Sequence, residues 1–184
     1  MSLSAKTKNV EFRQLLASKL DRSNLLERFF DLLKEWHVNF CLIRGQALNA
    51  YVEPVVSLDL DVVIAADRLS EVESHVTKLF EVERFAHSLN VSDRGSDLRI
   101  QIQLDSRYHP FVDRAIVGEV LGLRVPVAAA DDILQGKIWA VQDETRRGSK
   151  RQKDLADIAR ILEAHPHLRS LIPPDVLQRL IASS

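Results

Sequence analysis

Two aspartates stand in an otherwise apolar segment, Ser57-Leu58-Asp59-Leu60-Asp61-Val62-Val63-Ile64. The β-branched residues that follow them predict a strand, in which side chains two residues apart share a face and lie roughly 7 Å apart. Two carboxylates at that distance repel each other, and burying them without a partner is costly. A divalent cation relieves both problems, and Mg²⁺ prefers such oxygen ligands. The alternative is a pair of aspartates on a solvated strand face.

A glycine turn lies a short way upstream, in Ile43-Arg44-Gly45-Gln46-Ala47. Here a predicted strand over 38–43 runs into a short predicted helix over 45–52. Backbone N–H groups at such a helix start can bind phosphate. A single glycine is more often typical of an ordinary turn between a strand and a helix.

Lys137 lies on the apolar stripe of a helix predicted over 131–145. Its neighbours three and four residues away are all apolar, namely Ile133, Leu134, Ala140 and Val141. A lysine is rarely buried without a partner, so Lys137 needs an anion or must extend its amine to solvent.

Basic residues gather at the start of the next predicted helix, over 151–164. Five cations precede or open it within eight residues, and the segment Lys153-Asp154-Leu155-Ala156-Asp157-Ile158 follows. Lys153 and Asp157 have the spacing of an ordinary surface ion pair. The five cations form either a solvated loop or a patch for phosphates or RNA; they are Arg146, Arg147, Lys150, Arg151 and Lys153.

The composition indicates one globular domain over residues 1–184. Hydrophobic residues make up 46% and charged residues 28% of the 184, and the formal net charge is −1. This near-neutral balance argues against a broad nucleic-acid-binding surface. The single cysteine, Cys41, excludes a disulfide within the chain and a cysteine zinc cluster. No signal peptide or bilayer-spanning run is recognisable, so we expect a cytoplasmic protein without membrane attachment.

Apolar spacing predicts the elements that must position these residues. Strands are expected over 38–43, 58–66 and 98–104, and a hairpin over 114–127 turns near Leu121-Gly122. The fold class is therefore α+β, with a small mixed sheet and helices on one face. We expect N-terminal helices over 1–37, an α/β core over 38–127 and a helical region over 128–184. Outside the core, helices are predicted over 10–20, 24–37, 131–145, 151–164 and 174–182. Inside the core, two helices are predicted, the short one over 45–52 and another over 68–80.

Taken together, these motifs resemble the nucleotidyltransferase superfamily that includes DNA polymerase β and the aminoglycoside nucleotidyltransferases. The chain is most similar to the small bacterial nucleotidyltransferases related to the abortive-infection type IV toxins. The resemblance covers roughly residues 38–162 and implies the superfamily's mixed sheet. It rests on the turn 41–49, the Asp-x-Asp of 57–61, Lys137-Ile138-Trp139-Ala140 and Lys153-Asp154-Leu155-Ala156-Asp157-Ile158.

The resemblance implies Mg²⁺-dependent transfer of a nucleoside monophosphate from ATP or another NTP to an unidentified acceptor. That acceptor would be a small molecule, an RNA end or a protein, and an antitoxin-type partner protein is possible. Asp59 and Asp61 would be catalytic and would hold Mg²⁺ against the phosphates. The implied nucleotide-binding residues are Arg44, Gly45, Gln46, Ser57, Lys137, Lys153, Asp154 and Asp157.

The sequence departs from the family pattern at three places. Arg44 replaces the first glycine of the turn, and Val55 replaces the arginine before the aspartate pair. The third catalytic carboxylate is expected within the strand 98–104, but Gln101 and Gln103 occupy its central positions. An amide cannot take the acceptor's proton.

This third departure leaves two interpretations open. In the first, Asp105, which shares the face of the two glutamines, is the third catalytic carboxylate and supports a second Mg²⁺ ion. In the second, the chain is a catalytically degraded scaffold that binds a nucleotide or a partner.

Overall fold

A seven-stranded mixed sheet forms the centre of the molecule, in the order β3-β4-β5-β2-β1-β7-β6. The structure is a computed structural model that describes residues 25–55, 57–94 and 96–182. The helix predicted over 10–20 lies outside these residues. The strands are β1 (Phe40–Ile43), β2 (Asp59–Ile64), β3 (Glu81–Arg84), β4 (Ser88–Ser92), β5 (Arg99–Gln103), β6 (Ile116–Val120) and β7 (Leu123–Val127).

The central strand β2 fixes the position of the aspartate pair. It runs antiparallel to β1 and parallel to β5, and the register places Asp61 beside Ile43 on one side and Gln101 on the other. β1 also pairs with β7 in parallel, whereas the outer pairs β3–β4, β4–β5 and β6–β7 are antiparallel. The sheet is therefore mixed, and the α+β class is confirmed.

The hairpin of β3 and β4 extends the sheet beyond the predicted strands. β3 is largely exposed and carries Glu81, Glu83 and Arg84, so it lacks the apolar run by which a strand is recognised. The other predicted hairpin is confirmed as β6 and β7. Its turn residues Leu121 and Gly122 both have positive φ angles, 54° and 80°, as a two-residue type I′ turn requires.

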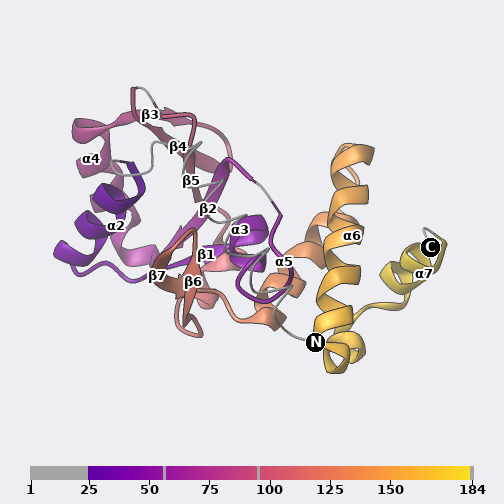
Figure 1. Cartoon of the computed structure of the whole chain (residues 1–184). Helices are drawn as coiled ribbons and strands as arrows, with labels where there is room; N and C mark the ends of the chain where they lie inside the picture. The colour runs from indigo at the N-terminus through magenta and orange to yellow at the C-terminus, as the bar shows by residue number, and fades with distance from the viewer. Residues whose placement is uncertain (1–24, 56, 95, 183–184) are drawn as a thin grey trace.

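The described helices are found close to where apolar spacing predicts them. Figure 1 shows α2 and α4 on one side of the sheet, and α6 and α7 beyond α5 on the opposite side. The helices therefore cover both faces of the sheet rather than the one face that was predicted, which is why β1 and β2 are buried on both faces. Short 3₁₀ helices occupy Ala66–Arg68, Ser106–Phe111 and Pro166–Leu171. The α-helices are α2 (Leu25–Glu35), α3 (Arg44–Leu48), α4 (Leu69–Leu79), α5 (Ala130–Gln142), α6 (Gly148–Ala164) and α7 (Pro174–Ala182).

One hydrophobic core joins the sheet to the helices. Phe30 of α2 stacks on Phe40 of β1 with ring centroids 5.2 Å apart, and Phe29 meets the ring of Phe80 after α4. Cys41 is fully buried within β1. No helix in the described part of the chain is both long and apolar enough to cross a membrane.

Candidate functional site

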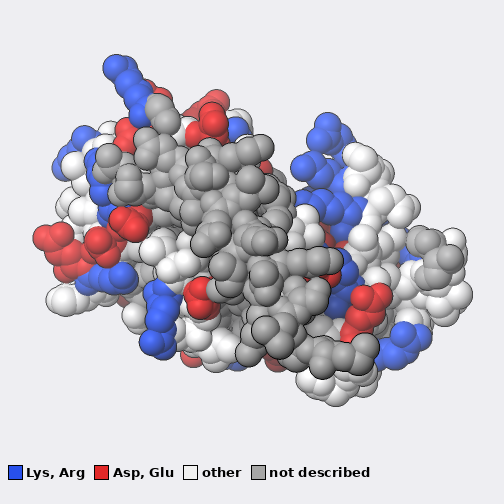
Figure 2. Space-filling view, viewed as in Figure 1, with Lys and Arg blue, Asp and Glu red and all other residues white. Residues whose placement is uncertain are grey.

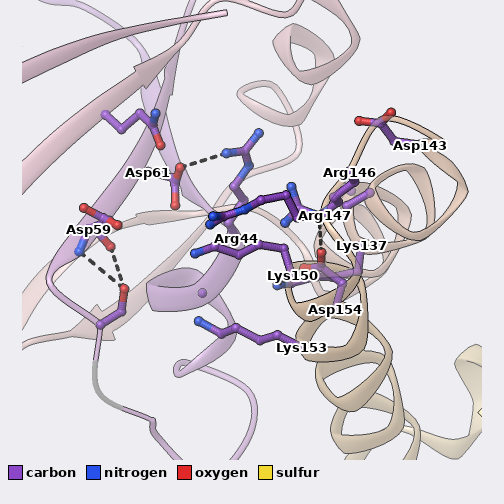
Figure 3. Close-up of a pocket in the computed structure, with 15 residues that line it drawn as sticks. Arg44, Asp59, Asp61, Lys137, Asp143, Arg146, Arg147, Lys150, Lys153 and Asp154 are labelled. Atoms are coloured by element: carbon purple, nitrogen blue, oxygen red, sulfur yellow. Dashed lines mark hydrogen bonds and ion pairs between the residues drawn. The ribbon is translucent and has the colours of Figure 1, made fainter. Parts of the chain in front are cut away.

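A pocket of about 360 Å³ lies between the sheet and the C-terminal helices (Figure 3). The edge of the sheet, the turn into α3, the end of α5 and the start of α6 all contribute to its walls. Its lining is unusually rich in charge and consists of Arg44, Gly45, Ser57, Asp59, Asp61, Gln101, Gly136, Lys137, Ala140, Asp143, Arg146, Arg147, Lys150, Lys153 and Asp154.

Asp59 and Asp61 form a carboxylate wall on the sheet side of this pocket. β2 begins at Asp59, whose side chain is 57% exposed, whereas the side chain of Asp61 is 11% exposed. Burial raises the pKa of Asp61 above its ordinary value; the charge of Arg44 opposes that rise and the charge of Asp59 adds to it. The structure therefore brings the two predicted aspartates together, with the inner one held in a setting that disfavours an uncompensated charge.

Arg44 lies directly on the inner aspartate. Its Nη1 donates to Oδ1 of Asp61 over 3.1 Å, and its Cζ is 5.6 Å from the ring centroid of Tyr108. Burial disfavours the Arg44 cation, but Asp61 and Tyr108 outweigh this and raise the pKa of Arg44. The guanidinium is therefore a resident positive charge beside the carboxylate pair.

The position facing Asp61 on β5 belongs to a neutral amide. Gln101 is the register partner of Asp61, it lines the same pocket, and its Nε2 donates to Oγ of Ser88 over 3.0 Å. The amide at this position is visible in the sequence, and the register places it next to Asp61. The pocket therefore has an amide where a third carboxylate would be expected.

Asp105 lies in a second pocket, together with Gln103 and Tyr108. Its carboxylate accepts hydrogen bonds from the backbone and the guanidinium of Arg107, and Arg107 lowers the pKa of Asp105. Within the described residues, no three His, Cys, Asp or Glu side chains form a group that could hold a metal ion. The structure thus does not bring Asp105 together with Asp59 and Asp61.

A cationic wall faces the carboxylates across the pocket. Figure 3 shows Arg147, Lys150 and Lys153 extending from the start of α6 toward the side that carries Asp59 and Asp61, and Figure 2 shows basic side chains gathered over this end of α6. Among the described residues, none of these three cations has a carboxylate oxygen within 4.0 Å. The three cations also lie at the positive end of the α6 dipole, which disfavours positive charge there unless an anion is bound nearby.

Lys137 is held in a buried ionic network behind this wall. Its Nζ lies 2.9 Å from Oδ1 of Asp154 and 2.5 Å from Oδ2 of Asp157, and all three side chains are at most 7% exposed. Arg146 binds the other oxygen of Asp154, and Arg160 binds the other oxygen of Asp157. The anion that the apolar stripe of Lys137 requires is therefore supplied by the protein itself.

The remaining predicted residues divide between the pocket and its support. Gly45 and Ser57 line the pocket, whereas Gln46 and Asp157 do not. The Gln46 amide is buried and donates to the Ser57 carbonyl, so it holds the segment that leads into β2.

Two further lining residues had no motif to reveal them. Gly136 shares the pocket face of α5 with Lys137, and a Cβ at this position would lie 3.2 Å from Cε1 of Tyr108. Asp143 follows the end of α5.

The donor set suits one divalent cation better than two. Asp59 and Asp61 offer the hard oxygen atoms that Mg²⁺ prefers, and Arg44 binds only one oxygen of Asp61. A second ion would need a further carboxylate, but the third position holds the Gln101 amide. The residues present therefore fit one ion, and a bound anion would supply the ligands that the protein does not.

The sequence matches a known protein family. The sequence pattern described as "Nucleotidyl transferase AbiEii toxin, Type IV TA system" matches residues 45–184, which is most of the chain. The chain belongs to this family. The match includes the aspartate pair, the Lys137 motif and the Lys-Asp-x-x-Asp helix, so the resemblance drawn from these residues is confirmed.

Solved structures show the same fold at low sequence identity. The crystal structure of ANT(2″)-Ia in complex with adenylyl-2″-tobramycin has a TM-score of 0.55 and 15% identity, covering 86% of this chain and 94% of that one. An antigenic nucleotidyltransferase-like protein from Paracoccidioides brasiliensis has a TM-score of 0.51 and 17% identity, covering 83% of each chain. A search of curated proteins by sequence finds no match. The AbiEii-family chain therefore has a nucleotidyltransferase fold.

Proposed function

We propose that this AbiEii-family chain binds a nucleoside triphosphate in the pocket and transfers its nucleoside monophosphate to an acceptor. One observation carries the proposal: Asp59 and Asp61 face Arg147, Lys150 and Lys153 across a single pocket. The cations offer a place for the triphosphate, and the aspartates offer a place for Mg²⁺ between protein and phosphates. The neighbouring fold, whose crystal structure contains adenylyl-2″-tobramycin, supports this assignment.

In the proposed reaction an acceptor oxygen attacks the α-phosphorus of the nucleotide. A new oxygen–phosphorus bond forms, the bond between the α-phosphorus and the β-phosphate breaks, and pyrophosphate leaves. Mg²⁺, when bound, would neutralise charge on the phosphate oxygens. Lys150 and Lys153 would stabilise the leaving pyrophosphate, whereas the buried Lys137 network would hold the start of α6 in place. Because Gln101 is neutral, the acceptor's proton would leave to water through the open side of the pocket.

Pyrophosphate release from each NTP in Mg²⁺ tests this function, with small-molecule, RNA and protein fractions supplied as acceptors. We expect release with the parent protein and none above background with Asp59→Asn plus Asp61→Asn. Asp105→Asn should retain release, because Asp105 lies in the other pocket and is paired with Arg107. No release from any NTP with the parent protein would contradict a transferase.

A specific observation supports a second candidate function, a nucleotide-binding scaffold without transfer. Gln101 occupies the position beside Asp61 that would complete a three-carboxylate site, and Arg44 already neutralises Asp61. In that case the parent protein binds nucleotide without releasing pyrophosphate, and Gln101→Asp gains a weak activity. An antitoxin-type partner protein remains our proposal in both cases and follows from the family.

A further inference from the structure

Arg44 has a strained backbone and a side chain that binds one member of the carboxylate pair, Asp61. Its φ angle is +62°, in the left-handed region that side chains other than glycine rarely adopt. Such a conformation persists where the surroundings determine it, and it is concentrated at functional sites. Here the surroundings are Asp61, which binds the guanidinium, and the ring of Tyr108 beneath it.

The Arg44 guanidinium lies where a metal ion would compete with it. It occupies Oδ1 of Asp61, one of the oxygens available to a divalent cation in this pocket. With Gln101 neutral, Asp59 and Asp61 contribute two negative charges and Arg44 cancels one of them. A free divalent cation therefore meets both a weaker field and a blocked ligand.

Arg44 also has space into which it can move. Its side chain is 36% exposed and lines both the carboxylate pocket and the second pocket that contains Tyr108. A triphosphate in the carboxylate pocket would offer the guanidinium a better partner than Asp61, because arginine binds phosphate oxygens in a bidentate manner.

We propose that Arg44 makes metal binding conditional on nucleotide. In the nucleotide-free protein Arg44 holds Asp61 and competes with the divalent cation; when a triphosphate binds, the guanidinium moves to the phosphates and releases Asp61. Metal therefore enters together with the nucleotide rather than before it. This inference rests on the proposed nucleotide site and identifies Arg44 as a positioning residue for the ion.

Binding of Mn²⁺ alone, followed by electron paramagnetic resonance, tests the proposal on the full chain. Arg44→Gln keeps a side chain at this backbone position but removes the charge, and we expect it to bind Mn²⁺ at least about ten-fold more tightly than the parent protein. Arg99→Gln is the matched control, because Arg99 lies 4.0 Å from Asp59 and does not contact Asp61. It should change the Mn²⁺ affinity by less than about three-fold, since exposed pairs are weak. Arg44→Gly is a second variant that also removes the charge and adopts the positive φ freely, and it should show the same gain in Mn²⁺ affinity.

A non-hydrolysable ATP analogue then provides the second half of the test. With the analogue bound, the parent protein and Arg44→Gln should hold Mn²⁺ about equally, and Arg44→Gln should bind the analogue itself more weakly. Equal Mn²⁺ affinity of the parent protein and Arg44→Gln without nucleotide would overturn the role of Arg44. The proposed nucleotide site is judged separately, by whether Asp59→Asn plus Asp61→Asn weakens binding of the analogue in Mg²⁺, and the proposed transfer by pyrophosphate release.

Discussion

Replacing Lys137 by methionine should destabilise the fold rather than merely weaken nucleotide binding. The apolar neighbours of Lys137 alone would suggest that methionine packs well in its place. The structure changes this expectation, because Nζ of Lys137 lies within 2.9 Å of both Asp154 and Asp157. The Lys137→Met variant leaves two buried carboxylates without their shared cation.

The size of the effect follows from what each carboxylate retains. Removing one partner of a buried ion pair costs about 3–5 kcal/mol. Arg146 still binds Asp154 and Arg160 still binds Asp157, so the lower end of that range applies, about 3 kcal/mol. For a chain of this size, such a loss lowers the melting temperature by roughly 6–12 °C.

Thermal and urea unfolding at neutral pH measure this loss. Lys150→Met is the matched control, because Lys150 is exposed on the rim of the same pocket and should change the stability by less than about 0.5 kcal/mol. Adding Asp154→Asn and Asp157→Asn to Lys137→Met should recover part of the loss, because the two buried carboxylates are then neutral while the partly exposed Arg146 and Arg160 lose their partners. A Lys137→Met variant that melts within a degree of the parent protein would refute the buried network.

Three further outcomes follow from the structure. In an Asp61→Asn background, Arg44→Gly should raise the free energy of unfolding by about 1 kcal/mol, because it relieves the positive φ without abandoning a charged partner; unchanged urea unfolding would show that the turn carries no strain. Burial, with a smaller contribution from the Asp132 charge, raises the pKa of Cys41 from 9.0 to about 12. The native protein should therefore resist Ellman's reagent at pH 8 and react once unfolded in urea, whereas rapid labelling of the native protein would contradict a buried thiol. Lys150→Gln and Lys153→Gln should each weaken ATP binding by roughly two- to five-fold in calorimetry, the modest effect expected of exposed cations, and unchanged affinities would remove them from the phosphate site.

The central strands could be predicted because their residues are apolar on both faces. β1 and β2 are almost entirely buried, so their sequences are continuous apolar runs, and the aspartate pair stands out within one of them. β3 could not be found in this way, because a largely exposed edge strand carries the charges of a surface loop.

The candidate site was predictable in its parts but not in its assembly. The Asp-x-Asp motif, Lys137 and the basic cluster at the start of α6 each have a local signature, and the structure places the aspartates, Lys137 and four of the five cations around one pocket. The register between β2 and β5 determines which residue lies beside the aspartate pair. Gln101 lies beside Asp61, whereas Asp105 pairs with Arg107. Spacing along one strand gives the face of a residue but not its partner across the sheet.

Calorimetric titration of the parent protein with each NTP in Mg²⁺ shows whether the carboxylate wall and the cationic wall together form a nucleoside triphosphate site. We expect at least one NTP to bind the parent protein, and Asp59→Asn plus Asp61→Asn to lose at least about ten-fold in affinity, which corresponds to 1.4 kcal/mol. Equal affinities of the double variant and the parent protein, both in Mg²⁺, would show that Asp59 and Asp61 take no part in binding the nucleotide.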